Sequence, residues 1–257
     1  MAIILKSQKE LQKMRRAGRL VAECHALVRG VLKPGITTLE LDSLVAEHIK
    51  RQDGTSPFLG YAPPGMTPYP ASICTSVNEV VVHGIPGPRV LQEGDIVSVD
   101  IGVTLDGYVG DSAWSYPVGR VAPHASALLE VAEQCLWAAL KEARANQRLG
   151  DLGAAIQGHA KRHGYGVLRE FGSHGVGRRM HEDPHIPNYG TAGTGLRLRP
   201  GMTMAIEPMV TEGDYRVAEL DDGWTIVTID GKLSAHFEHT IAITPDGAPE
   251  ILTQRVE

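Results

Sequence analysis

The sequence predicts an α+β fold in which two halves repeat the same order of elements. Two amphipathic helical segments followed by strand-like segments occur twice, and corresponding helices begin about 115 residues apart. No low-complexity or Pro/Ser-rich linker separates the two occurrences. We therefore expect residues 1–257 to form one domain with halves at about 7–120 and 121–250, with antiparallel strands inside and helices on one side.

Capping sequences mark the predicted helices of the first half. A capping box at Ser7–Glu10 opens the first helix, whose apolar residues recur at helical spacing as far as Gly30. A second box at Thr37–Glu40 opens a helix that should run to about Gly54. Each box supplies partners for backbone N–H groups that the first helical turn leaves unpaired.

The second half contains its own pair of helices. Pro123 is a favoured first helical residue and starts the third helix. Asp151 is expected to cap a fourth helix that ends at Gly164. Strands should fill the chain from about Ala71 through Trp114, and again after the fourth helix.

A hairpin between Ile96 and Asp111 carries the first sign of chemistry. Asp106-Gly107 predicts a two-residue type I′ turn, which places Asp111 opposite Gly102. Asp100 lies two residues further along the same strand and so projects from the same face. The two carboxylates should then form a diagonal pair roughly 7–8 Å apart at the backbone.

The surroundings of this carboxylate pair are mostly apolar, as in a protein core. Two ionised carboxylates facing each other there are costly unless a positive group lies between them, and one or two metal ions would serve. The alternative is a solvated hairpin face that carries both aspartates without any ligand.

The second half brings its own acidic residues. Glu207 lies in the strand-like run Gly201–Val210, and Asp230-Gly231 is a second hairpin signal. The outgoing strand, Leu233–Ile243, contains Glu238. A single buried glutamate usually pairs with Arg or Lys, but the nearby sequence offers no evident partner. Two acidic residues per half therefore predict a shared site in a crevice between the halves.

Histidines supply further candidate ligands. His181 to His185 matches H-E-x-x-H, the helical signature of zinc proteases, but Pro184 would lie inside that helix at a cost of about 3 kcal/mol. We therefore reject a mononuclear zinc protease. His174, in an open Gly-rich segment, is better placed as a ligand. His83 ends a strand next to a turn, where a lone histidine is usually structural or exposed.

Composition excludes several classes of function. The formal net charge of −5 provides no basic field for nucleic acid, and no apolar run reaches the ~18 residues of a membrane span. Met1–Lys6 is too short for a signal peptide. Three widely spaced cysteines, Cys24, Cys74 and Cys135, argue against a disulfide framework and for the cytoplasm.

The candidate residues, taken in order, resemble those of a known family. The set Asp100, Asp111, His174, Glu207 and Glu238 resembles the five ligands of the pita-bread metallopeptidases. Within that group the chain resembles type I methionine aminopeptidases from about residue 7 to 245. The motifs that carry the resemblance are S-V-N-E-V-V-V-H-G-I-P at Ser76–Pro86, D-I-G-V at Asp100–Val103, G-D-S-A at Gly110–Ala113, H-G-V-G-x-x-x-H-E-x-P at His174–Pro184, I-E-P-M at Ile206–Met209 and S-A-H-F-E-H-T at Ser234–Thr240.

This resemblance implies a pita-bread fold, with two pseudo-symmetric ααββ halves that enclose a dinuclear metal site in a single catalytic domain. Asp100 would bind one metal ion through both oxygens, and Asp111 and Glu238 would bridge the two ions. His174 and Glu207 would hold the other ion. His83 and His181 would contact the substrate peptide.

The implied activity is that of a methionyl aminopeptidase, which removes the N-terminal methionine of nascent proteins when the second residue is small. Four carboxylates and one imidazole suit divalent Co, Mn, Fe or Zn. Two such ions can hold a hydroxide that attacks the first peptide bond. Glu207 would accept its proton, and His181 would hydrogen-bond to the peptide. Substrates would be N-terminal segments of nascent polypeptides, with docking near the ribosomal exit tunnel left open and a monomer expected.

Four further residues are plausible walls of a thioether pocket, since sulfur packs well on aromatic edges. Each is also an ordinary core residue in the alternative interpretation. They are Tyr61, Tyr69, Cys74 and Trp224.

Two departures from the family pattern stand out. Ser173 replaces the usual glycine before the ligand histidine, and the loop Tyr61–Pro70 is longer than usual and lacks a histidine. These leave the pocket shape open but do not affect the ligands.

Two other functions remain as alternatives. A prolidase or aminopeptidase P would share the ligands, but those enzymes usually carry an additional N-terminal domain, whereas six residues precede Ser7 here. A non-catalytic pita-bread binding module would be expected to have lost ligands.

Overall fold

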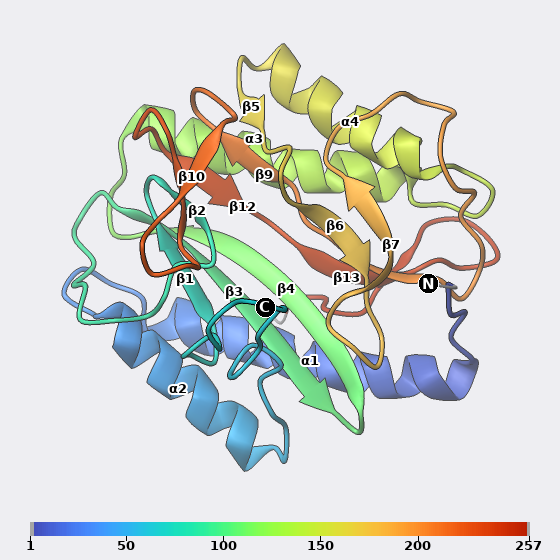
Figure 1. Ribbon diagram of the computed structural model, residues 1–257, viewed down its shortest axis with the longest axis horizontal. Coiled ribbons are helices and arrows are strands. Elements are labelled where there is room, and N and C mark those ends of the chain that lie inside the picture. Colours follow the sequence, from blue (N-terminus) through green and yellow to red (C-terminus); the bar gives the residue numbers. More distant parts are fainter. Residues whose placement is uncertain (1–2, 256–257) are drawn as a thin grey trace.

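Two pairs of helices flank a set of antiparallel strands in the computed structural model, which describes residues 3–255 (Figure 1). Residues 1–2 and 256–257 lie outside the described part. They include the first residues of the segment Met1–Lys6 and both ends of the expected 1–257 domain. The helices are α1 (Gln8–Val31), α2 (Thr38–Arg51), α3 (Pro123–Glu142) and α4 (Leu149–Arg162). None of the described helices combines the length and apolarity that a membrane span requires.

Fourteen strands form four sheets within the described residues, and every pairing between them is antiparallel. In chain order the strands are β1 (Cys74–Val77), β2 (Val80–Val82), β3 (Ile96–Leu105), β4 (Tyr108–Pro117), β5 (Gly166–Val167), β6 (Gly172–Gly175), β7 (Glu182–Pro187), β8 (Thr203–Ile206), β9 (Met209–Thr211), β10 (Val217–Glu219), β11 (Ile226–Thr228), β12 (Ser234–His236), β13 (His239–Ala242) and β14 (Glu250–Ile251).

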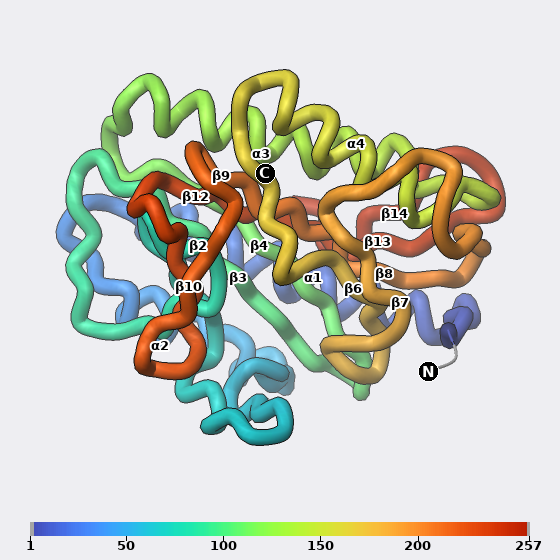
Figure 2. The backbone as a smooth tube through the Cα atoms, turned by 45° about the horizontal axis from the view of Figure 1, so that its top comes forward, coloured from blue at the N-terminus to red at the C-terminus, as the bar shows by residue number. Residues whose placement is uncertain are grey.

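The sheets have the orders β1-β3-β4, β10-β11-β2, β12-β9-β5 and β14-β13-β8-β6-β7. The second of them joins segments far apart in the sequence, because β2 precedes the hairpin and β11 lies near the end of the chain (Figure 2). Helix α1 packs on β3 and β4, whereas α3 packs on β9 and β12. The α+β class with antiparallel strands is thus confirmed.

Both capping boxes of the first half form as predicted. The Ser7 hydroxyl accepts a hydrogen bond from the backbone N–H of Glu10, whose carboxylate accepts one from the Ser7 backbone at 2.8 Å. Thr37 and Glu40 repeat this exchange at the start of α2. The helices end within a turn of the predicted positions.

The prediction for the start of α4 was wrong. Its N-cap is Arg148, and Asp151 is the third helical residue. The Asp151 carboxylate reaches back to accept the backbone N–H of Arg148 at 2.7 Å, and it also accepts the N–H of Gly193 at 2.6 Å. Acidic residues are favourable both at the cap and in the first turn of a helix, so sequence alone did not separate the two roles.

The hairpin of the first half has the predicted register. Leu105 pairs with Tyr108 and Gly102 lies opposite Asp111. The turn residues Asp106 and Gly107 have φ values of 52° and 74°, as a type I′ turn requires. This register decides which face Asp111 occupies, since a slip of one residue would turn it away from Asp100.

The second hairpin signal was misinterpreted. Asp230-Gly231 does form a turn, and the Asp230 carboxylate accepts the N–H groups of Asp214 and Lys232. The strands on either side do not pair with each other, however. Strand β11 pairs with β10 and β2, whereas β12 pairs with β9, so the turn passes the chain from one sheet to another.

Candidate active site

One cavity of about 470 Å³ gathers all the residues that the sequence singled out for chemistry. The five acidic and histidine candidates line it together with His83 and His181, and the four pocket candidates line it as well. None of the described side chains that line this cavity is Lys or Arg. A group of carboxylates without a protein cation is the arrangement that the sequence predicted.

The first half contributes Asp100 from β3 and Asp111 from β4. Asp111 is only 4% exposed, and Oδ1 of each aspartate is buried without a hydrogen-bond partner among the described residues. The backbone of Asp111 is bound to Thr240 on β13, whose hydroxyl accepts from its N–H at 2.9 Å and donates to its carbonyl at 2.8 Å. The hairpin is thus fixed to the second half directly beside the carboxylates.

The second half contributes His174 from β6, with Glu207 and Glu238 at breaks between strands. Both glutamates were expected inside strands, and that detail was wrong. Glu207 follows β8, and Glu238 separates β12 from β13. At such breaks the backbone finds other partners: the Glu207 N–H donates to the Ser173 hydroxyl at 2.9 Å, and the Glu238 N–H donates to the carbonyl of Ala113 at 2.8 Å. Ser173, the departure from the family pattern, therefore supports Glu207.

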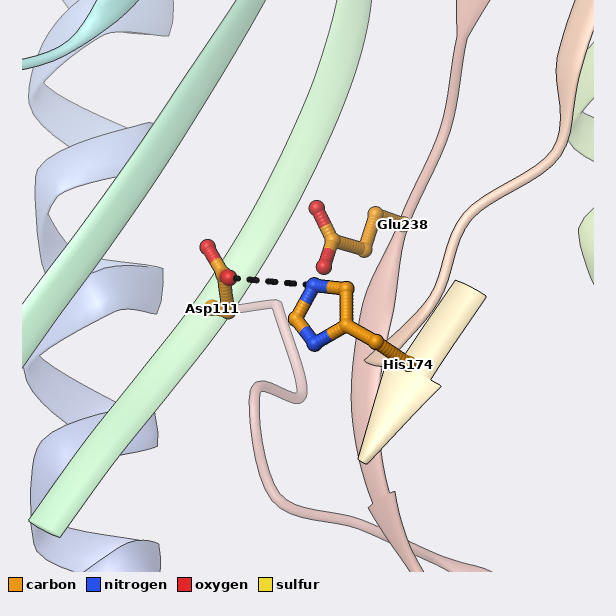
Figure 3. A group of neighbouring side chains, drawn as sticks. All are labelled: Asp111, His174 and Glu238. Carbon is orange, nitrogen blue, oxygen red and sulfur yellow. Dashed lines mark ion pairs between the residues drawn. The ribbon is translucent and has the colours of Figure 1, made fainter. Parts of the chain in front are cut away.

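The side chains of Asp111, His174 and Glu238 converge from β4, from β6 and from the break between β12 and β13 (Figure 3). One ligand atom from each lies within 4.8 Å of the other two. Nε2 of His174 lies 3.9 Å from Oδ2 of Asp111 and 3.4 Å from Oε1 of Glu207. These spacings bring possible metal ligands from both halves to one point.

The electrostatics of this cluster oppose charged carboxylates in the absence of a cation. Burial raises the pKa of Asp111 to about 7. Burial and the neighbouring carboxylates raise the pKa values of Asp100, Glu207 and Glu238 well above their ordinary values. Burial, together with His181, lowers the pKa of His174 to about 3. His174 is therefore neutral, which is the form that binds a metal.

The two other candidate histidines, His83 and His181, lie beside this cluster. His83 follows β2 with a φ of 59°, an uncommon conformation for a residue other than glycine and one often found at functional sites. His181 precedes β7, and its ring centroid is 4.4 Å from that of His174. The H-E-x-x-H segment, His181–His185, leads into strand β7 and forms no helix, so the rejection of the zinc-protease motif was correct. The Tyr61 hydroxyl lies 3.0 Å from Nδ1 of His181.

Aromatic and sulfur-containing side chains form the adjoining wall of the cavity. Tyr69 and Trp224 meet edge to face with ring centroids 5.1 Å apart. Cys74 on β1 lies opposite Asp100 on β3 in the strand register. Sequence reasoning missed Phe58 and Met180, which belong to the same buried cluster. Met180 occupies a variable position of the motif His174–Pro184 and Phe58 lies outside the motifs, so no signal pointed to either residue.

The long loop Tyr61–Pro70 forms part of this wall. Two backbone hydrogen bonds of 2.8 Å, from Gly60 to Tyr69 and from Tyr69 to Tyr61, close its base. Met66 lines the cavity from the loop, and the indole N–H of Trp224 donates to the carbonyl of Thr67 at 3.0 Å. The insertion therefore extends the pocket wall and leaves the metal-site strands undisturbed.

A buried cluster of carboxylates and an imidazole that lines a cavity is typical of a metal-dependent hydrolase. The chain belongs to metallopeptidase family M24, whose model matches residues 12–245. It is 51% identical to methionine aminopeptidase 1 of Bacillus subtilis over 252 residues, which cover 98% of this chain and 99% of the relative. It is 46% identical to methionine aminopeptidase of Clostridium perfringens, with 98% of each chain covered.

Solved structures agree with this assignment. Methionine aminopeptidase from Thermotoga maritima superimposes with a TM-score of 0.94 at 47% identity, covering 99% of this chain and all of that one. Prolidase from Pyrococcus horikoshii has a TM-score of 0.76 at 21% identity, covering 99% of this chain and 64% of that one, which shows the fold alone. The pita-bread fold and the class of metal-dependent exopeptidases are confirmed, and the alternatives are not favoured.

Proposed function

We propose that this protein removes the N-terminal methionine from nascent polypeptides whose second residue is small. One observation carries the proposal: a single cavity joins a cluster of possible metal ligands to a pocket of aromatic and sulfur-containing side chains. Such a pocket suits a thioether, and the adjoining cluster suits hydrolysis of the bond that follows it. The identity to methionine aminopeptidases over nearly the whole chain supports the same activity.

Two divalent ions, of Co, Mn, Fe or Zn, fit the cluster. Buried carboxylate oxygens of Asp100, Asp111 and Glu238 have no hydrogen-bond partner in the described part of the chain, so cations would satisfy them. Asp100 would hold one ion and His174 with Glu207 the other, while Asp111 and Glu238 would bridge them. Bound ions of this kind supply an acidified water and polarise the scissile carbonyl.

The protein side chains would orient the peptide and transfer the proton of the attacking hydroxide. Glu207 lies at the edge of the cluster, where it can accept a proton and pass it to the leaving amine. Burial lowers the pKa of His181, so its neutral ring can donate a hydrogen bond to the peptide while Nδ1 accepts one from Tyr61. His83 faces the same space and would contact the substrate.

Specificity would come from the two ends of this cavity. Burial raises the pKa of the Cys74 thiol well above its ordinary value, which keeps the wall of the pocket uncharged for a methionine side chain. Tyr61, Tyr69 and Trp224 supply aromatic edges. The second residue of the substrate would lie next to the ligands, where the walls leave room for a small side chain only.

The setting of the enzyme follows from the same observations. We infer one catalytic domain over residues 1–257, with halves at about 7–120 and 121–250, because one buried apolar cluster runs from Leu20 to Ile243 across both. Its three cysteines are buried and free, as expected for a protein of the cytoplasm. We expect it to act as a monomer on the N-terminal segments of nascent polypeptides.

A peptide panel tests the proposed activity. Met-Ala-Ser should be cleaved at least tenfold better in kcat/KM than Met-Leu-Ser or Leu-Ala-Ser, since about 1.4 kcal/mol of steric or packing loss gives that factor. Released amino acids can be measured by chromatography after metal loading. If Leu-Ala-Ser or Met-Leu-Ser is cleaved as fast as Met-Ala-Ser, the enzyme is a different aminopeptidase.

His181→Ala tests the assignment of this histidine to the peptide. We expect kcat to fall by about 10²–10⁴-fold, as for loss of a positioned proton donor, while the metal content stays that of the wild type. His185→Ala is the matched control, because His185 is the other histidine of the same motif and lies exposed on β7. Loss of metal in His181→Ala would make it a ligand and contradict the assignment.

A further inference from the structure

His236 is a buried histidine beside the metal cluster that has no partner for one ring nitrogen. It lies on β12, is 2% exposed, and its Nε2 makes no hydrogen bond among the described residues. That atom lies 3.4 Å from Oε2 of Glu207 and 4.0 Å from Oε2 of Glu238. A buried polar atom without a partner is destabilising, so its orientation toward two carboxylates requires an explanation.

The Glu207 carboxylate lies between two imidazoles. Nε2 of His174 is 3.4 Å from its Oε1, and Nε2 of His236 is 3.4 Å from its Oε2. The backbone of Glu207 is fixed independently, because its N–H donates to Ser173 and its carbonyl accepts from Asn188 at 2.9 Å. These bonds fix the backbone only, so the orientation of the carboxylate depends on side-chain contacts such as those with the two rings.

We propose that His236 is a positioning residue, which donates its Nε2–H to Oε2 of Glu207 and so presents Oε1 to the metal ion held with His174. A small rotation of either side chain would shorten 3.4 Å to an ordinary hydrogen bond. Carboxylates that bind metals are regularly held in this way by a second hydrogen bond. This inference rests on the proposed function, because it needs a metal ion at His174 and Glu207.

The tautomer of His236 decides between this role and a direct bond to the metal. A neutral imidazole carries one N–H. A neutral ring has two possible tautomers, and only the one with the proton on Nε2 can donate to Glu207. The other tautomer would leave Nε2 as a direct metal ligand, which is the competing arrangement.

Metal affinity of two His236 variants separates these arrangements. His236→Gln keeps an N–H donor on a side chain of similar reach, whereas His236→Leu removes it. Cobalt binding measured by calorimetry on the intact protein should stay within about threefold in His236→Gln and weaken by about 10–100-fold in His236→Leu. His239→Gln is the control, since His239 is buried in the same motif but bonds to the Thr253 hydroxyl at 2.9 Å.

Each outcome decides between the possibilities. Equal losses in both His236 variants would make His236 a direct ligand, and wild-type affinity in His236→Leu would make it a packing residue; either result overturns the proposal. Failure of the wild type to bind cobalt would instead refute the proposed function. Should His236→Leu fail to fold, ¹⁵N spectra of the zinc-loaded wild type still report the tautomer. They should show a protonated Nε2 at His236, and a bare Nε2 overturns the proposal.

Discussion

Asp111→Asn should lower kcat/KM by about a thousandfold or more and reduce bound metal well below two ions per chain. Asp111 reaches the cluster from β4, with Oδ2 3.9 Å from His174 Nε2 and Oδ1 buried without a partner. A carboxamide offers one oxygen and no charge, so it cannot bridge two cations. Loss of roughly 4 kcal/mol of transition-state stabilisation corresponds to that factor, and metal centres supply several kcal/mol.

Elemental analysis after dialysis, together with anomalous diffraction, measures this effect. The wild type should show two anomalous peaks roughly 3–4 Å apart, and the variant one or none. Asp106→Asn makes the same chemical change at the exposed turn of the same hairpin and should keep both ions. A single peak in metal-replete wild-type crystals, or full metal content in Asp111→Asn, would contradict the bridging role.

Asp111→Asn should also stabilise the metal-free protein at neutral pH. The folded pKa of Asp111, about 7, lies above its unfolded value, so the folded state binds more protons between these two values. The stability of the metal-free wild type therefore falls as pH rises from about 4 to about 7. Asp111→Asn removes this contribution, and its metal-free melting temperature at pH 8 should exceed that of the wild type.

Among the variants proposed here, Lys6→Met should lower the free energy of unfolding most, by about 3–5 kcal/mol. Lys6 Nζ lies 2.7 Å from Oε2 of Glu182, and the two side chains are only 3% and 6% exposed. The variant would leave Glu182 buried without its cation, although the backbone N–H groups of Arg178 and Arg179 still donate to Oε1. At this chain length we expect the melting temperature to fall by roughly 6–20 °C.

An exposed ion pair on the helix that follows Lys6 provides the control. Arg16 of α1 pairs with Asp106 at the surface, and Arg16→Ala should cost less than about 1 kcal/mol. The double variant with Lys6→Met and Glu182→Gln should recover part of the stability, because no buried charge is then left alone. Equal effects of Lys6→Met and Arg16→Ala would show that the buried pair is not important for stability.

The strongest sequence predictions rest on local rules with a defined geometry. The Asp106-Gly107 turn set the register of β3 and β4, and that register brought Asp100 and Asp111 to one face. The capping boxes at Ser7 and Thr37 located two helix starts for the same reason. In these cases backbone geometry over two to four residues determines the outcome, with little contribution from distant contacts.

What the sequence left undetermined depends on distant partners. Asp230-Gly231 looks like the first hairpin turn, but β11 pairs with β2, a strand from the other half. The breaks at Glu207 and Glu238 likewise depend on hydrogen bonds to residues distant in sequence, such as Ser173 and Ala113. His236 was missed as well: it ends β12 two residues before Glu238, and the chain breaks between them, so the strand rule does not relate their side chains.

The closed base of the Tyr61–Pro70 loop separates the evolution of specificity from that of catalysis. Its two backbone hydrogen bonds join Gly60 and Tyr61 to Tyr69 and use no atom of the residues between Tyr61 and Tyr69. Insertions and deletions at the loop tip can therefore reshape the pocket wall with little effect on the register of β3 and β4. Directed evolution toward other N-terminal residues should begin at Ala62–Met66, ahead of Thr67, whose carbonyl accepts the indole N–H of Trp224.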